Sequence, residues 1–519
     1  MKFFKFNRKK LKSSASKKKM VPCDDSFLPS DNINQLLCLQ GKTDAIRAFV
    51  SEECFNFKES TSDDKTSTSL LPSMLVSYHQ STRTIFENYQ MQVNSHQESI
   101  LSSNSSILDN LVKKKSVDKG VSMVHAMWNI LPLGASIFSL PYCVIAGGYF
   151  VLPLIFIISA MADATGILLV DCLYVVSHNT KQRKKVNSNY VDIARCVWGE
   201  VGGHIFNAFL VFYLFSGCVV NVILLGKSIH DLLHSSTNFS FGLLTTLFSV
   251  LIYPTLFIKK LTVLAYLSMA AVFSVLVGIF TIILAFFLEL ENWKNNIGEI
   301  SLINANGLSL ASGIIMLSCE VHSVIPHAEG IMRESSKINF VLHRSFIGTA
   351  LVKFLVALLG SLTYGSTTQS IVTLNVATVN RSAHVVCSLT TLLYAILNYP
   401  LNMFIISEFI DNFIKNTKIK SSVPFFCLWI ACTRFILITL TVLVAVFVPY
   451  FAVVLGLRGS LIGTCLIFIF PCYFHLKLKW DILSSRQRTW DIFLLTVGIL
   501  FGAAGLYASV MRLVVIIQT

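Results

Sequence analysis

The sequence predicts an all-α polytopic membrane protein with about eleven transmembrane helices, arranged as two inverted sets of five plus one extra helix. Of its 519 residues, 54% are hydrophobic and 13% are charged, and the mean hydropathy is +0.65. In soluble globular domains, about a quarter of all residues are charged. Apolar runs long enough to cross a hydrocarbon core of roughly 30 Å recur between residues 121 and 517.

Residues 1–118 differ from the rest of the chain. They are rich in Ser, Asn, Asp and Lys and have few long apolar runs, so we expect a disordered, basic, cytosolic tail. The tail begins MKFFKFNRKKLKSSASKKKM, which lacks the continuous apolar core of a secretory signal peptide. It either reinforces the cytosolic placement of the N-terminus or binds anionic lipid heads. We therefore attribute the net charge of +14 to basic residues on the cytosolic side of the membrane. No nucleic-acid partner is expected.

Residues 119–519 form the predicted transmembrane domain. Each apolar run is taken as a helix because a backbone that faces lipid must satisfy its own hydrogen bonds. The predicted spans are residues 123–145, 151–176, 201–229, 241–257, 261–288, 308–332, 345–365, 383–409, 423–448, 451–476 and 491–517.

Loop charge predicts the orientation, because Lys and Arg accumulate on the cytosolic side of short loops. The loops after spans two, four, six, eight and ten carry Lys181, Arg183, Lys184, Lys185, Lys259, Lys260, Arg333, Lys337, Arg344, Lys415, Lys418, Lys420, Lys477, Lys479, Arg486 and Arg488. The alternate loops carry little beyond Lys294 and Arg381. We therefore expect a cytosolic N-terminus and a lumenal or extracellular C-terminus. The sequons at Asn238 and Asn380 then become candidate glycosylation sites, whereas the sequon at Asn104 is cytosolic.

Several function classes are disfavoured. The thirteen cysteines are scattered and include no C-x-x-C pair, so neither a zinc site nor a disulfide framework is indicated. The sequence contains no Gly-rich phosphate loop and no nucleophile elbow, so no enzyme, metal or cofactor is expected. A membrane-embedded acyltransferase would need an acceptor or nucleophile beside a buried His, and a channel would need a filter-like loop.

Two spans are unsuited to being continuous helices. The first reads WNILPLGASIFSLPYCVIAGG, with Pro132 and Gly134 in mid-span, and the sixth reads GLSLASGIIMLSCEVHSVIPHAEGIM, with Gly313 and Ser318. Proline removes a backbone donor and glycine loosens a helix, so each span could unwind locally. Unwound backbone at membrane depth is tolerated only where it lines a cavity or is buried in protein. The alternative is that both are kinked packing helices.

The spacing of these two spans favours a transporter core. Spans one and six lie five apart, as expected for two inverted halves whose broken helices meet near the membrane midplane. Amides at half-helix N-termini attract a carboxylate, and freed carbonyls accept a cation or an ammonium group. A zwitterionic amino acid fits such a site.

Several motifs resemble those of a known family. The stretch GASIFSLPY, from Gly134 to Tyr142, resembles a signature of the amino acid/auxin permease family. The sixth span is similar to its vesicular inhibitory amino acid transporter branch through Gly313, Ile314, Ile315, Ser318, Pro326, Glu329, Gly330 and Met332. The resemblance continues through FIKKLTVLAYLS, NYPL and VAVFVPYFAVVLGLRGSLIGTCLIFIFPCYFHLKLKW, and covers residues 120–515. Ser136, Ser139, Tyr213, Glu320 and His322 depart from the residues expected at their positions.

The resemblance implies a leucine-transporter-like fold and proton-linked movement of small amino acids. The vesicular branch implies loading of GABA or glycine into synaptic vesicles, with protons as the coupling ion and chloride as a further candidate. The alternative is a plasma-membrane or lysosomal proton–amino acid symporter of the same family. The candidate substrate-binding residues are Asn129, Gly134, Ala135, Ser136, Ile137, Gly313, Ser318 and His322.

Ionisable residues inside the spans are the remaining candidates, because a charge in a membrane is costly unless it faces a partner or a wet cavity. Glu320 and His322 lie close to the expected break and could carry or gate a proton. Substrate contact and satisfied polar packing remain alternatives for both. Lys353, Glu408 and Arg434 are candidate structural charges, and Glu408 and Arg434 could pair across spans eight and nine.

Overall fold

The computed structural model describes residues 121–131, 133–176, 183–233, 239–258, 260–378, 380–413 and 423–518. The predicted tail of residues 1–118 and the sequon at Asn238 lie outside the described residues. The sequon at Asn380 is described: this side chain is exposed just before a helix, and its Oδ1 accepts a hydrogen bond from the amide of Ser382.

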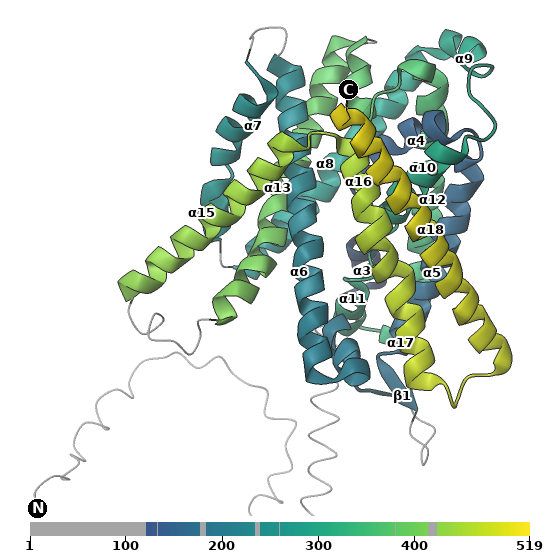
Figure 1. Cartoon of the computed structure of the whole chain (residues 1–519), viewed down its shortest axis with the longest axis vertical. Helices are drawn as coiled ribbons and strands as arrows, with labels where there is room; N and C mark the ends of the chain where they lie inside the picture. Colours follow the sequence, from purple (N-terminus) through teal and green to yellow (C-terminus); the bar gives the residue numbers. More distant parts are fainter. Residues whose placement is uncertain are drawn as a thin grey trace, which may run out of the picture. The chain divides into compact units, whose positions relative to one another are not determined.

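The described part of the chain is a bundle of apolar helices, which confirms the all-α membrane class (Figure 1). Eight helices in these ranges are long and apolar enough to cross a membrane. Three shorter apolar helices, Ala135–Gly147, Phe241–Phe257 and Ala305–Ser318, fall in predicted spans one, four and six. The number of complete crossings therefore stays a prediction.

Both irregular spans are broken. Span one consists of α3 (Met123–Ile130), the 3-10 helix η1 (Ala135–Ser139) and α4 (Leu140–Gly147). Span six consists of α10 (Ala305–Ser318) and α11 (Ile325–Ile331). Helix α10 packs against α4, and α11 packs against α3, so the two broken spans run in opposite directions (Figure 1). This arrangement is the one expected of two inverted halves.

The other helices surround these two spans. They are α5 (Val151–Asp171), α6 (Tyr190–Leu233), α7 (Phe241–Val250), η2 (Tyr253–Phe257), α8 (Leu261–Leu288), α9 (Leu290–Asn296), η3 (Ser335–Lys337), α12 (Ile338–Tyr364), η4 (Gly365–Thr367), η5 (Val372–Thr378), α13 (Arg381–Phe413), α15 (Val423–Phe447), α16 (Phe451–Arg458), the π-helical η6 (Gly459–Gly463) and η7 (Cys465–Ile469), α17 (Phe470–Lys479) and α18 (Ser485–Gln518). Helix α6 begins earlier than the predicted span three and bends at Gly199, whose φ of 74° is a conformation that glycine adopts without steric cost.

Extended backbone also occurs at one end of the bundle. Strands β1 (Tyr174–Val176) and β2 (Arg183–Lys185) pair as an antiparallel ribbon between α5 and α6. The amide of Val121 donates a hydrogen bond to the carbonyl of Ile331 at 2.9 Å, and the amide of Arg333 donates to the carbonyl of Val121 at 3.1 Å. The chain entering span one is therefore attached to the chain leaving span six.

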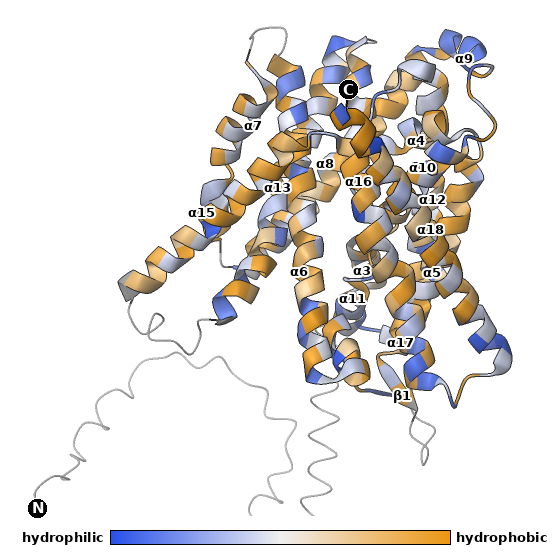
Figure 2. Cartoon of the chain, viewed as in Figure 1, coloured by the Kyte–Doolittle hydropathy of each residue, from blue (hydrophilic) through white to orange (hydrophobic). Residues whose placement is uncertain are grey.

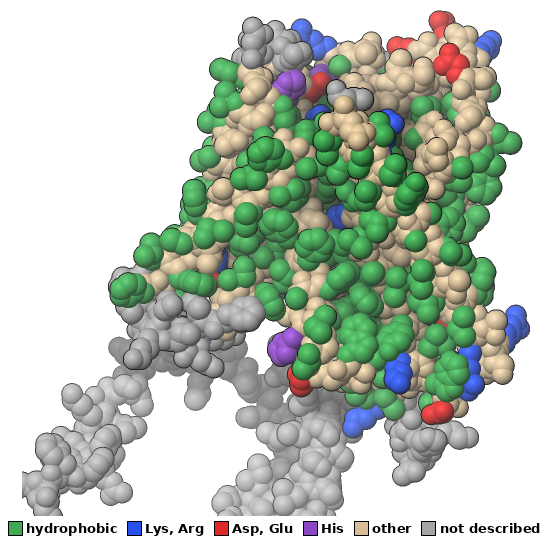
Figure 3. Space-filling model, viewed as in Figure 1, with side chains coloured by type: hydrophobic (Ala, Val, Ile, Leu, Met, Phe, Trp, Pro, Cys, Tyr) green, Lys and Arg blue, Asp and Glu red, His purple; other side chains and the backbone are tan. Residues whose placement is uncertain are grey.

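The surface of the bundle is apolar over its middle. Phe212, Phe273 and Phe447 are 53%, 67% and 74% exposed, which a soluble monomer rarely tolerates over a contiguous area. Figure 2 shows hydrophobic residues along the outer helices, with hydrophilic residues concentrated near the two ends. Figure 3 shows the same division on the visible face, where hydrophobic side chains cover the middle. This distribution matches a protein whose solvent is the bilayer core.

Candidate functional site

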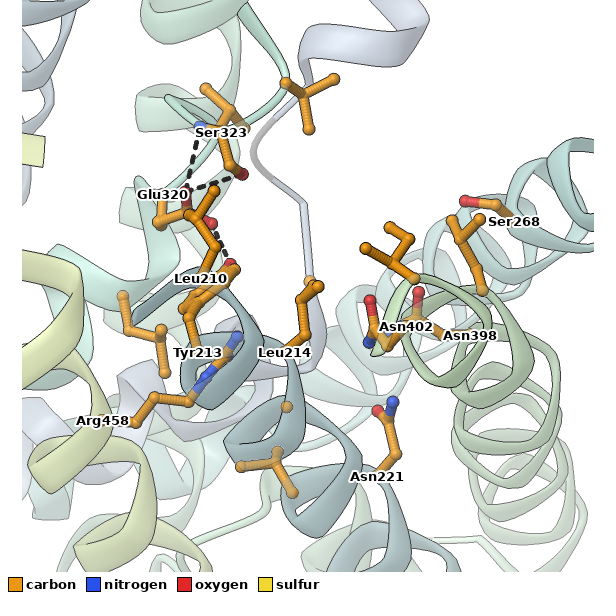
Figure 4. Close-up of a pocket in the computed structure, with 18 of the residues that line it drawn as sticks. Leu210, Tyr213, Leu214, Asn221, Ser268, Glu320, Ser323, Asn398, Asn402 and Arg458 are labelled. Atoms are coloured by element: carbon orange, nitrogen blue, oxygen red, sulfur yellow. Dashed lines mark hydrogen bonds between the residues drawn. The ribbon is translucent and has the colours of Figure 1, made fainter. Parts of the chain in front are cut away.

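A cavity of about 580 Å³, lined by both polar and apolar residues, lies where the two broken spans meet. One wall is formed by the break of span one and by Ser318 to Val324 of span six. The opposite walls are one face of α6, from Asn207 to Asn221, and one face of α13, from Tyr394 to Asn412 (Figure 4). The cavity thus runs from the breaks towards the C-terminal end of α13, the end predicted to be cytosolic.

The break of span one contributes three of the predicted substrate-binding residues. Gly134, Ala135 and Ser136 line the cavity, and a Cβ atom at Gly134 would lie 3.5 Å from the hydroxyl oxygen of Tyr394. Ile137 is 1% exposed and packs in the core instead of lining the cavity. The side chain of Asn129 lies outside the described residues.

The break of span six contributes Ser318 and Glu320. One carboxylate oxygen of Glu320 accepts a hydrogen bond from the hydroxyl of Tyr213, which projects from the middle of α6. The other oxygen accepts from the hydroxyl of Ser323 at 3.1 Å (Figure 4). Glu320 is therefore held at the cavity wall by neutral donors, so its charge stays available to a ligand.

Arg458 is a cavity residue that the sequence analysis missed. It ends α16, and its guanidinium carbon lies 4.4 Å from the centroid of the Tyr213 ring. Its Nε donates a hydrogen bond to Ser216 Oγ at 3.1 Å. Arg458 forms no ion pair with a carboxylate in the part of the chain that the structure describes. Its position inside the apolar tenth span was the signal, because a cation within a span is a functional candidate by default.

His322 lies away from the cavity, although it is only two residues from Glu320. The imidazole is completely buried, its Nε2 lies 3.1 Å from Thr165 Oγ1 on α5, and its ring faces Phe346 on α12. Because the chain between α10 and α11 is not helical, neighbouring side chains leave it in different directions. Only Glu320 of this pair reaches the cavity.

Gly313 does not lie at the break of span six. It is an interior residue of α10, where a Cβ atom would lie 2.2 Å from Ser460 Oγ and 2.8 Å from the carbonyl oxygen of Gly456. The expectation that Gly313 permits the break is therefore wrong. Its physical role is to let α10 approach α16 and η6 closely, as small residues do between membrane helices.

Lys353 stabilises the end of α10. It is completely buried on α12, and its Nζ donates to the carbonyl oxygen of Ser318 at 2.7 Å and to Cys319 Sγ at 3.4 Å. The last carbonyls of a helix carry partial negative charge, which a cation offsets. Lys353 therefore helps to fix where α10 stops and the break begins.

Arg434 pairs with Asp411, so the predicted pair with Glu408 is wrong. Its two terminal nitrogens donate to the two carboxylate oxygens of Asp411 at 2.9 and 2.6 Å. Trp429 Nε1 also donates to Asp411 at 3.1 Å. Glu408 lies nearly one turn earlier on α13, where it is exposed and lines the cavity. Sequence spacing does not distinguish two acids within one helical turn.

The ion pair between Arg434 and Asp411 predicts that Asp411 contributes more to stability than Glu408 does. Asp411→Asn is expected to lower the unfolding temperature by several degrees, because Arg434 is 7% exposed and would lose its carboxylate partner. Glu408→Gln is expected to leave the unfolding temperature nearly unchanged. Thermal unfolding of the purified variants in detergent measures both effects, and equal destabilisation would contradict the pairing.

Comparison with known proteins identifies the family. Residues 119–511 match the family model described as "Transmembrane amino acid transporter protein". The chain belongs to the transmembrane amino acid transporter family. This confirms the resemblance seen in GASIFSLPY and in the sixth span, and the matched residues of this family member include both broken spans and the whole cavity.

Individual relatives are similar over most of their length. A vesicular inhibitory amino acid transporter of Xenopus tropicalis is 27% identical over 75% of this chain and 77% of its own. A vesicular GABA transporter of Caenorhabditis elegans is 27% identical over 76% of this chain and 80% of its own. An amino acid transporter of Arabidopsis thaliana is 26% identical over 73% of this chain and 68% of its own. Among solved structures, the nucleobase-cation-symport-1 family transporter Mhp1 aligns over 76% of this chain and 92% of its own, with 11% identity and a TM-score of 0.45.

Proposed function

We propose that this transmembrane amino acid transporter is a secondary active carrier of GABA- or glycine-like amino acids, driven by a proton gradient and placed in a vesicle membrane. The observation that carries the proposal is the cavity between the two broken spans, which holds an acid, Glu320, and a cation, Arg458. A zwitterion presents the complementary pair of charges. The names of the vesicular relatives support the substrate class and the location.

Binding uses both backbone and side chains. Gly134, Ala135 and Ser136 line the cavity at the break of span one, where backbone groups that a continuous helix would use internally can bind the substrate. The substrate ammonium group binds Glu320. Lys353 holds the end of α10 in place but does not contact the substrate.

Competition for Glu320 couples the substrate to the proton. An ionised Glu320 attracts the ammonium group, whereas a protonated Glu320 is neutral and binds it weakly. In a cavity open to the cytosol the carboxylate is ionised and the amino acid binds. In a cavity open to an acidic lumen a proton displaces the amino acid, so one proton leaves the lumen as one substrate enters. His322, which lies outside the cavity, is the second candidate for the proton, and chloride is a further candidate for a transported ion.

The same cavity would serve a symporter of the plasma membrane or the lysosome, in which the proton and the amino acid bind together instead of competing for Glu320. The Arabidopsis relative is described only as an amino acid transporter, and its identity to this chain is 26%, against 27% for the Xenopus vesicular relative. Similarity to the vesicular relatives therefore does not decide between the two locations. Co-localisation of the tagged protein with a synaptic-vesicle marker, a lysosomal marker or neither decides between the locations.

Flux of labelled amino acids into proteoliposomes tests the proposal. With an acidic interior, we expect GABA or glycine to accumulate above the external concentration, and the accumulation to collapse when a protonophore is added. Liposomes without protein and liposomes with a neutral interior are the controls. Accumulation that is unaffected by the protonophore would contradict proton coupling, and the absence of flux for every amino acid tested would contradict the proposed function as a whole.

A further inference from the structure

Hydrogen-bond donors converge over the bare backbone of Gly217 on α6. A Cβ atom at this position would lie 3.1 Å from Arg458 Nη2 and 3.5 Å from Asn402 Nδ2. The two donors come from α16 and α13, so three helices bring them to one place. All three residues line the central cavity. Because Gly217 has no side chain, both donors can approach the backbone of α6 at this point.

Asn221 adds a third donor, about one helical turn further along α6. Its side chain is 3% exposed and lines the same cavity, yet its Nδ2 has no hydrogen-bond partner among the described residues. Figure 4 shows Asn221 and Asn402 across the gap between α6 and α13. A buried donor without an acceptor destabilises the fold, and a bound acceptor would remove that cost.

The charge of this place is positive. Arg458 contributes a guanidinium group, which remains ionised in proteins, and no carboxylate pairs with it in the described ranges. Two acids of the described chain, Glu320 and Glu408, line the cavity, and neither pairs with Arg458. Glu320 contacts the hydroxyl of Tyr213, whereas Arg458 lies over the Tyr213 ring. The tyrosine side chain therefore holds the acid and the cation apart. A guanidinium group with two amide donors matches an anion that accepts several hydrogen bonds at once.

We propose that Arg458, Asn402 and Asn221 bind the carboxylate of the substrate over Gly217, on the far side of Tyr213 from the ammonium site at Glu320. This assignment rests on the proposed transport of amino acids. It makes Arg458 the residue that separates amino acids from simple amines. It also explains why α6 carries a glycine at a point where the nearest atoms to a Cβ belong to the side chains of Arg458 and Asn402.

The decisive variant is Gly217→Ala, which places a methyl group 3.1 Å from Arg458 Nη2 and 3.5 Å from Asn402 Nδ2 and so displaces the donors from the carboxylate. Alanine favours a helix more than glycine does, so this change is not expected to impair folding. The matched control is Gly348→Ala on α12, where a Cβ atom would meet nothing within 4 Å. We expect the KM for GABA or glycine uptake to rise by about tenfold or more in Gly217→Ala, because a charge-assisted hydrogen bond contributes about 1.5–3 kcal/mol. The KM of Gly348→Ala should equal that of the parent.

Two further variants keep the proposal testable if Gly217→Ala is poorly folded. Asn221→Asp exchanges the unpartnered donor for a carboxylate, and Arg458→Gln removes the cation. Each should reduce the inhibition of uptake by butyrate, which has a carboxylate and no amine, and retain the inhibition by butylamine, which has the amine alone. Loss of butylamine inhibition with retention of butyrate inhibition would overturn the assignment.

Titration of the purified parent separates the possible anions. We expect sodium butyrate to raise the unfolding temperature more than sodium chloride does at equal ionic strength, and Gly217→Ala to remove the difference. Stabilisation by chloride alone would show a halide site and overturn the carboxylate assignment. If the parent transports amino acids and Gly217→Ala, Asn221→Asp and Arg458→Gln all match its KM, the carboxylate site is wrong while the proposed function stands. If the parent transports no amino acid, the proposed function fails.

Discussion

Glu320→Gln is expected to abolish uphill, gradient-driven uptake. The amide oxygen can accept a hydrogen bond from one of the two hydroxyls, Tyr213 or Ser323, and the amide nitrogen can donate to the other, so the cavity wall should keep its shape. It can neither be ionised nor take up a proton, so the competition between proton and ammonium group is lost. Uptake into proteoliposomes with an acidic interior should stop at the external concentration, and its rate should no longer follow the imposed pH difference.

His322→Gln is the matched control for this change. The imidazole lies outside the cavity, beside Thr165, and glutamine keeps hydrogen-bonding capacity at that position. We expect this variant to retain gradient-driven accumulation. If accumulation survives in Glu320→Gln and disappears in His322→Gln, the proton pathway runs through α5 and α12 instead. If both variants follow the pH gradient as the parent does, neither residue carries the coupling proton.

Gly459→Ala is expected to cause a large loss of folded protein. A Cβ atom at Gly459 would lie 1.8 Å from the carbonyl oxygen of Gly313, and backbone atoms of two packed helices cannot shift as a flexible side chain can. The cost should exceed the roughly 1–3 kcal/mol of ordinary overpacking. Size-exclusion chromatography of a fluorescent fusion should show a reduced monodisperse peak and a lower unfolding temperature.

Gly313→Ala probes the same contact from the other helix, and Gly348→Ala is the control for both. We expect Gly313→Ala also to reduce the amount of folded protein, because it would meet Ser460 Oγ at 2.2 Å. If Gly313 lay at a helix break, its replacement would instead abolish transport and leave the amount of folded protein unchanged. Normal abundance and normal unfolding temperature in both variants would mean that α10 and η6 are further apart than the structure indicates.

The sequence by itself determined the class of the fold and the places where helices break. Apolar runs show which segments face a bilayer, because no lipid-exposed backbone can leave its hydrogen bonds unmade. Pro132 and Gly134 marked the first break, and the polar run after Ser318 marked the second. Both signals can be seen in the sequence because a proline removes a backbone donor, and a polar side chain incurs a burial cost, at its own position. The same reasoning singled out Glu320 and His322 together, and of these only Glu320 lines the cavity.

Only the tertiary structure decided which side chains share the cavity. Gly217 and Asn221 lie one turn apart on α6, whereas Asn402 and Arg458 are far from them along the chain. The four become a site because α6, α13 and α16 meet, and of them only Arg458, a cation within an apolar span, carried a signal in the sequence. The break of span six also determines where its side chains point. Outside a helix no fixed period relates neighbouring residues, so Glu320 enters the cavity while His322 packs against α5. Side-chain direction at an unwound segment depends on the surrounding helices, and the sequence pattern holds no information about that packing.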